Sequence, residues 1–132
     1  MSAHRVGPCV ALAEDDPEFR IILSEILLVR GYDVKEAADG IELWRWIERG
    51  GVDLVITDLL MPRRRGDEVL RHCRARGDTT PFIVMTTQID WARRLAGLPA
   101  VQIVAKPFTL DVMLTAIRGA LAGVIDSIAA TT

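Results

Sequence analysis

The 132-residue chain has few lysines and no long apolar run, and both shortages exclude classes of protein. Only two of its 16 cationic residues are lysines, and 18 acidic residues bring the formal net charge to -2. No global positive field is therefore present to hold nucleic acid or an anionic membrane. No segment approaches the roughly 18 uninterrupted apolar residues of a membrane span, and the first residues lack the apolar region of a signal peptide. We expect a cytoplasmic protein that binds its partners locally.

Cysteines are also scarce, and no glycine-rich phosphate loop is present. Cys9 and Cys73 have neither CxxC spacing nor clustered histidines, so we expect free thiols rather than a zinc or redox site. The absence of a GxGxxG motif argues against a dinucleotide-binding module. What the chain does contain is typical of one globular domain, with 50% hydrophobic and 26% charged residues.

Short apolar runs alternate with segments of helical spacing along the whole chain. The runs that we predict as strands are Pro8–Ala13, Tyr32–Ala37, Leu54–Thr57, Phe82–Met85 and Val101–Ala105. Between them, Asp16-Pro17 and Asp39-Gly40 are typical helix starts. A short helix is expected around Trp91–Leu95, and a last one over residues 109–124. This alternation predicts a doubly wound α/β fold, with a five-stranded parallel sheet and helices on both faces. We expect one domain over residues 1–125 and a short tail over residues 126–132.

Polar residues directly follow four of the predicted strands. They are Glu14, Asp15 and Asp16, then Asp58, then Thr86 and Thr87, and finally Lys106. Because doubly wound folds bind ligands at the carboxyl ends of their strands, we expect these side chains to form one site. Several carboxylates close together need a neutralising cation, and oxygen ligands without His or Cys favour Mg²⁺, with Mn²⁺ as the other possibility. The site is typical of a protein that handles phosphate.

Four short segments at these strand ends carry a family resemblance. The segments AEDDP, TDLLMPRRRG, FIVMTT and AKPF, taken in this order, resemble the receiver domain of bacterial two-component response regulators. The resemblance covers nearly the whole chain. It implies the flavodoxin-like strand order 2-1-3-4-5 and a phosphorylation switch rather than an enzyme with an external substrate.

The resemblance also implies a role for each site residue. Asp58 would accept a phosphoryl group from a histidine kinase or a histidine phosphotransfer protein and thereby change affinity for an output protein. Asp15, Asp58 and the backbone carbonyl of Leu60 would bind Mg²⁺ directly, and Glu14 would bind it through water. Thr86 and Lys106 would contact the phosphoryl oxygens. Asp16 is expected to cap the following helix instead.

Two features depart from the pattern of the family. Ile103 stands three positions before Lys106, where receivers commonly have an aromatic residue. We therefore do not expect the coupling between Thr86 and an aromatic ring that is usual in the family. Between Leu110 and Ile125 only Asp111 and Arg118 are charged, which is compatible with a homodimer through the last helix. The run Arg63–Arg65 is interpreted as a solvated loop rather than a surface that steers a partner.

Other functions stay open at this point. One is a Mg²⁺-dependent phosphohydrolase with an aspartyl nucleophile, although such enzymes place a second acid where this chain has Leu60. Another is that the chain is the receiver fragment of a larger regulator or a hybrid kinase. We expect no direct contact with nucleic acid or membrane.

Overall fold

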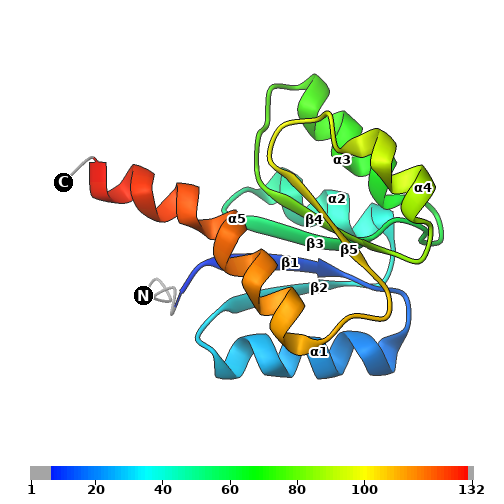
Figure 1. The fold of residues 1–132 in the computed structure, drawn as a ribbon, viewed down its shortest axis with the longest axis horizontal. Helices are drawn as coiled ribbons and strands as arrows, with labels where there is room; N and C mark the ends of the chain where they lie inside the picture. The colour runs from blue at the N-terminus through cyan, green and yellow to red at the C-terminus, as the bar shows by residue number, and fades with distance from the viewer. Residues whose placement is uncertain (1–6, 131–132) are drawn as a thin grey trace.

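The chain forms one five-stranded sheet in which all strands are parallel (Figure 1). The computed structural model describes residues 7–130, and the side chains of residues 7–122. The strands are β1 (Cys9–Ala13), β2 (Asp33–Ala37), β3 (Leu54–Asp58), β4 (Phe82–Thr86) and β5 (Val101–Ala105). Their order in the sheet is β2-β1-β3-β4-β5, which confirms the predicted fold class and strand order.

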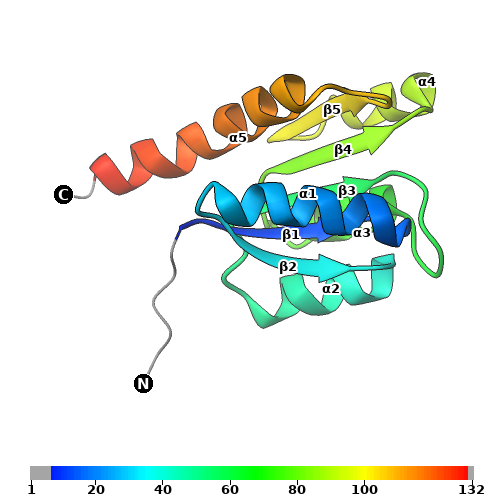
Figure 2. The same ribbon diagram turned by 90° about the horizontal axis from the view of Figure 1, so that it is seen from below.

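Helices connect the strands and cover both faces of the sheet (Figure 2). They are α1 (Pro17–Val29), α2 (Gly40–Arg49), α3 (Gly66–Ala75), α4 (Ile89–Ala92), the 3₁₀ helix η1 (Arg93–Leu95) and α5 (Leu110–Ala130). The helix between β4 and β5 is short, as the sequence predicts. Among residues 7–130, no helix combines the length and the apolar character that crossing a membrane requires.

Two hydrophobic cores lie on opposite faces of the sheet. Successive strand residues point to opposite faces, so Val10 and Leu12 pack in one core while Ala11 and Ala13 pack in the other. The first core includes buried side chains of α1 and α5, and the second includes those of α2, α3 and α4. The central strand β3 is buried along its whole length, since both cores cover it.

Side-chain caps begin two of the helices at the positions that the sequence indicates. The Asp16 carboxylate accepts hydrogen bonds from the backbone N–H groups of Glu18 and Phe19 at 3.1 and 3.5 Å. Asp39 does the same for Ile41 and Glu42, at 2.9 Å each. These bonds satisfy amide groups that a helix start leaves without partners. Asp16 thus caps α1, as predicted.

The last helix is longer than predicted. We expected it to end near residue 124, but α5 continues to Ala130. The physical reason is that no Pro or Gly follows Gly123 to end the helix, while the alanines near its end favour its continuation. The division into a domain over residues 1–125 and a tail over residues 126–132 stays a prediction. Residues 131–132 lie outside the described residues.

Candidate functional site

The carboxyl ends of β1, β3, β4 and β5 bring the predicted residues to one edge of the sheet. Asp58 ends β3 and is paired with Met85 of β4, while Thr86, the last residue of β4, is paired with Ala105 of β5. Lys106 follows directly, and its backbone N–H donates to the carbonyl of Thr86 at 2.9 Å. Because all strands run in the same direction, residues 14–15, 58, 86 and 106 meet although they are far apart in the sequence.

The Lys106 ammonium joins two of the acidic residues. Its Nζ lies 2.8 Å from Oε1 of Glu14 and 2.5 Å from Oδ1 of Asp58. Glu14 is 2% exposed and Asp58 5% exposed, so the carboxylates are held out of bulk water. The ammonium also lies 5.1 Å from the centre of the Phe19 ring. Buried charges of this kind persist only when they are paired, and here Lys106 supplies the pairing.

The protonation of the cluster reflects an excess of carboxylates over cations. Burial and, after it, the hydrogen-bonded Glu14 carboxylate raise the pKa of Asp58 to about 8, against the opposing effect of Lys106. Burial also raises the pKa of Asp15, with Glu14 acting in the same direction. Burial also acts to raise the pKa of Glu14. Hydrogen bonds with Asp58 and Lys106 outweigh this effect, so the pKa of Glu14 is lowered. One ammonium is therefore insufficient for three carboxyl groups.

The three carboxylates are placed as a divalent cation requires. Glu14, Asp15 and Asp58 each offer an oxygen, and these oxygens all lie within 4.8 Å of one another. Asp15 is exposed while the other two are buried, so the cluster opens to solvent on one side. A set of carboxylate oxygens with one open side suits Mg²⁺, which retains several water ligands. The residues present therefore fit a magnesium site.

Thr86 is buried at the same edge, and its hydroxyl oxygen already accepts one hydrogen bond. Its Oγ1 accepts a hydrogen bond from the backbone N–H of Gln88 at 2.8 Å, and the residue is 4% exposed. This bond holds the start of α4 against the end of β4. The hydroxyl proton is not used in that bond, so it can be donated to another oxygen.

A glycine allows α3 to start beside the acidic cluster. A Cβ atom on Gly66 would lie 2.1 Å from the carbonyl oxygen of Asp58, so no larger residue fits without moving the backbone. The Gly66 N–H also donates to the carbonyl of Leu59 at 2.9 Å. These contacts hold the loop after Asp58, which contains Leu60, close to the end of β3. The role of the Leu60 carbonyl as a ligand stays a prediction.

The run Arg63–Arg65 lies in a loop in which Arg63 and Arg65 are exposed, as interpreted, but its side chains also make specific contacts. The guanidinium groups contact Asp39 at 3.2 Å, Nδ1 of His72 at 2.9 Å and Asp67 at 3.0 Å, respectively. Arg65 also lies over the Trp91 ring of α4, 5.1 Å from its centre. The arginines thus tie the loop after Asp58 to α2, α3 and α4. Asp67 is two residues from Arg65, but the other partners lie farther along the chain, where a local sequence pattern does not reveal them.

Ile103 lies in β5 and is half-buried against the second core, which also contains Trp91. The aliphatic side chain therefore serves as packing between β5 and α4. Trp91 of α4 packs against the same core.

Comparisons with known protein sequences agree with this arrangement. The family model of the response regulator receiver domain matches residues 10–118. Response regulator MprA of Mycobacterium leprae is 36% identical over 114 residues, covering 85% of this chain and 50% of that protein. The DNA-binding transcriptional regulator NtrC of a Bradyrhizobium strain is 34% identical over 115 residues, covering 86% of this chain and 24% of that protein. The chain spans half of the length of the first relative and about a quarter of the second.

Solved structures give the same result. Response regulator TrrA of Thermotoga maritima, in complex with Mg²⁺-BeF, has a TM-score of 0.78 and 28% identity, covering 87% of this chain and all of that one. The receiver domain of sensor histidine kinase PA1611 of Pseudomonas aeruginosa, with magnesium in its active-site cleft, has a TM-score of 0.77 and 27% identity. That match covers 88% of this chain and 98% of the other.

Proposed function

The chain belongs to the response regulator receiver domain family, and on this premise we propose that Asp58 accepts a phosphoryl group from a histidine kinase or a histidine phosphotransfer protein. The observation that carries the proposal is the contact of one lysine with two buried carboxylates beside a third, exposed one. This set supplies a nucleophile, metal ligands and a fixed positive charge within a few ångströms. Phosphoryl transfer requires little else, because its loose transition state depends on positioning and charge.

In the proposed reaction, an oxygen of Asp58 attacks the phosphorus in line with the leaving group. A P–O bond to Asp58 forms as the P–N bond to the donor histidine breaks. The imidazole nitrogen leaves with the electron pair of that bond. The product is an acyl phosphate on Asp58 and a free histidine on the donor. Asp58 must be ionised to attack, and a bound cation favours this form by offsetting the burial that raises its pKa.

Lys106 and Thr86 hold the transferred group in this scheme. The Lys106 ammonium already bonds Oδ1 of Asp58, so it lies where an oxygen of a phosphoryl group on Asp58 would come. Thr86 keeps its hydroxyl proton available while it accepts from the N–H of Gln88. When that hydroxyl turns toward a phosphoryl oxygen, the bond to Gln88 weakens and the start of α4 is released. The switch therefore acts on α4 and its neighbours.

A magnesium ion would be held by Asp15, Asp58 and the backbone carbonyl of Leu60, with Glu14 contributing through water; Mn²⁺ suits the same oxygens. When bound, it neutralises charge on the equatorial phosphoryl oxygens. The separation of the three carboxylates and the absence of any His or Cys from the described cluster support this assignment.

The output of the switch is a changed affinity for another protein. The formal charge of -2 gives the chain no positive field for nucleic acid, so we assign it no direct contact with DNA. We also propose that it acts as a phospho-acceptor and not as an enzyme on external substrates. The cytoplasmic location stays a prediction.

Intact-mass spectrometry with a small phosphodonor tests the assignment. Incubation with acetyl phosphate and Mg²⁺ is expected to add one phosphoryl group, and chelation of the metal should abolish the addition. Asp58→Asn is expected to remove the adduct while keeping the fold, since the amide is nearly the same size as the carboxylate.

Two outcomes would contradict the proposal. One is an adduct of the same yield in Asp58→Asn. The other is steady hydrolysis of a small phosphate ester without any adduct, which would favour the phosphohydrolase. Asp16→Asn is the matched control, because this nearby carboxylate only caps α1 and its replacement should leave the adduct unchanged.

A further inference from the structure

The Lys106 ammonium has a third neighbour, which is an aromatic ring. Its Nζ lies 2.8 Å from Oε1 of Glu14, 2.5 Å from Oδ1 of Asp58 and 5.1 Å from the centre of the Phe19 ring. A cation within about 6 Å of the centre of a ring, over its face, is attracted by the negative charge of that face. The attraction is stronger where water is excluded, and the Lys106 side chain is only 25% exposed.

Contacts on two sides hold the Phe19 ring in place. Phe19 lies in the first turn of α1, where its backbone N–H donates to the capping Asp16 carboxylate at 3.5 Å. Its side chain is half-buried against the first core. The Phe108 ring, from the segment between β5 and α5, meets it edge to face, with the ring centres 5.8 Å apart and an angle of 84°. The ring is therefore a fixed neighbour of the lysine.

A ring face offers the ammonium something that the two carboxylates do not. Glu14 and Asp58 accept directional hydrogen bonds from Lys106, and these bonds must rearrange when the ammonium turns to an oxygen of a phosphoryl group. The ring attracts the charge without requiring one particular N–H direction. It can therefore keep the flexible lysine side chain at this edge of the sheet while the hydrogen-bond partners change.

We propose that Phe19 is a positioning residue for phosphoryl transfer, with its ring holding the Lys106 ammonium where the transferred group arrives. The inference rests on the proposed function of Asp58, and it assigns Phe19 no contact with the phosphoryl group. The ring acts through Lys106 alone. Apolar volume does not supply this effect, because a leucine would fill the same space against the core but has no negatively charged face.

Substitutions that separate the ring from its volume test the proposal. The rate of phosphorylation is followed by intact mass with acetyl phosphate and Mg²⁺. Phe19→Leu should be about three- to tenfold slower than the parent chain, the size expected for a partly desolvated contact between a cation and a ring. Phe19→Tyr keeps the ring face and should stay within about twofold of the parent. A role in apolar packing alone predicts the opposite order, since leucine is apolar and tyrosine adds a hydroxyl.

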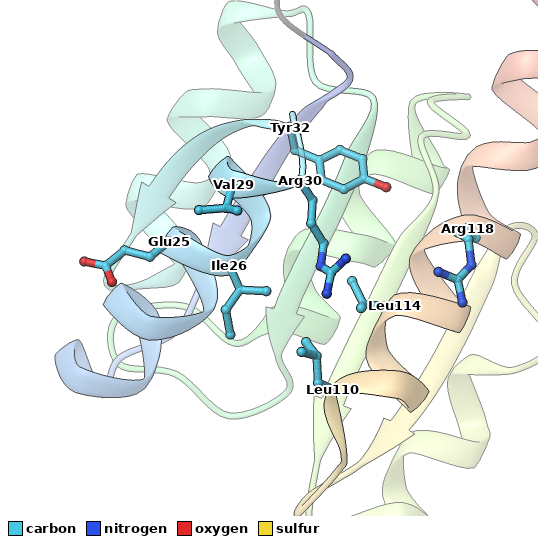
Figure 3. Close-up of a pocket in the computed structure, with 8 residues that line it drawn as sticks. All are labelled: Glu25, Ile26, Val29, Arg30, Tyr32, Leu110, Leu114 and Arg118. Atoms are coloured by element: carbon cyan, nitrogen blue, oxygen red, sulfur yellow. The ribbon is translucent and has the colours of Figure 1, made fainter.

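A double-mutant cycle tests whether the ring acts through the lysine. In a Lys106→Ala chain, Phe19→Leu should slow the reaction no further, because the cation that the ring attracts is gone. Tyr32→Leu is the matched control. Tyr32 is another half-buried ring packed against the first core, in a groove between α1 and α5 whose lining includes no residue of the acidic cluster (Figure 3). Its replacement should leave the rate unchanged.

The outcomes separate this inference from the proposed function. A parent chain that gains the adduct at Asp58, together with a Phe19→Leu rate within about twofold of the parent, would overturn the inference and leave the function standing. Equal slowing by Phe19→Leu in the parent and Lys106→Ala chains would also overturn it. A parent chain without the adduct would overturn both. Far-UV circular dichroism checks the folding of each variant, and Phe19→Met repeats the comparison with a second apolar side chain if Phe19→Leu does not fold.

Discussion

Charged side chains are usually exposed and apolar ones buried. The acidic edge of the sheet departs from the first rule, and the surface formed by α1 and α5 departs from the second. At the edge, charged groups are buried and joined, as in the contacts of Lys106 with Glu14 and Asp58. On the α1–α5 face, apolar side chains are exposed, and the charges of Glu25 and Arg118 lack ion-pair partners among the described residues. Each arrangement costs stability in the isolated chain. At the edge, this arrangement supports the proposed binding of a cation and a phosphoryl group.

The largest effect is expected from removing the lysine that joins the buried carboxylates. Lys106→Ala should slow phosphorylation by about 10²–10³-fold, because a fixed positive charge on the transferred group is lost. The rate is measured by intact mass over time with acetyl phosphate and Mg²⁺. Lys35→Ala removes the other lysine, whose contact with Asp33 is on the surface, and serves as the control. A Lys106→Ala rate within twofold of the parent would contradict the assigned role.

A pair of apolar substitutions on α1 contrasts the buried and exposed sides of one helix. Leu27→Ala should lower the free energy of unfolding by about 2–5 kcal/mol, since Leu27 is fully buried in the first core. Val29→Ser, two residues later, should change it by less than about 0.5 kcal/mol. Urea unfolding at low micromolar concentration provides both values. Comparable losses would show that Val29 is covered within the single copy.

Removing the carboxylate of Asp58 should stabilise the metal-free protein, in a pH-dependent way. The pKa of this group is about 8 in the folded chain and close to 4 when unfolded. The folded state therefore retains a proton that the unfolded state releases, and stability falls as pH rises between these values. Asp58→Asn should raise the free energy of unfolding by about 1–3 kcal/mol at pH 8 and hardly at all near pH 4. Urea unfolding in a chelator at both pH values tests this, and an equal gain at both would exclude ionisation as the cause.

The sequence allowed the fold and the acidic edge to be predicted because both depend on local patterns. The apolar run from Leu54 to Thr57 indicates a buried strand, and the polar residue directly after it must then lie at the edge of the sheet. This rule predicts that Asp15, Asp58 and Lys106 lie at the edge of the sheet. The order of the strands came from the family resemblance, since alternation alone does not specify it.

Other features could not be predicted, for identifiable physical reasons. Asp39, His72 and Trp91, which the run Arg63–Arg65 contacts, lie outside this loop and far enough along the chain that no local pattern marks them. The sequence did not show which apolar side chains of α1 would be exposed, because α1 is apolar on nearly all sides. Leu27 is buried and Leu28 is 52% exposed, although they are identical and adjacent. The end of α5 was placed too early because the sequence after residue 124 contains no strong stop signal.

The most direct test of the central claim is to locate the phosphoryl group on the chain. After phosphorylation with acetyl phosphate and Mg²⁺, borohydride reduction converts an aspartyl phosphate to homoserine, which peptide mass spectrometry assigns to one position. We expect homoserine at position 58 and at no other aspartate. Modification at Asp15 with none at Asp58, or an unmodified chain, would contradict it.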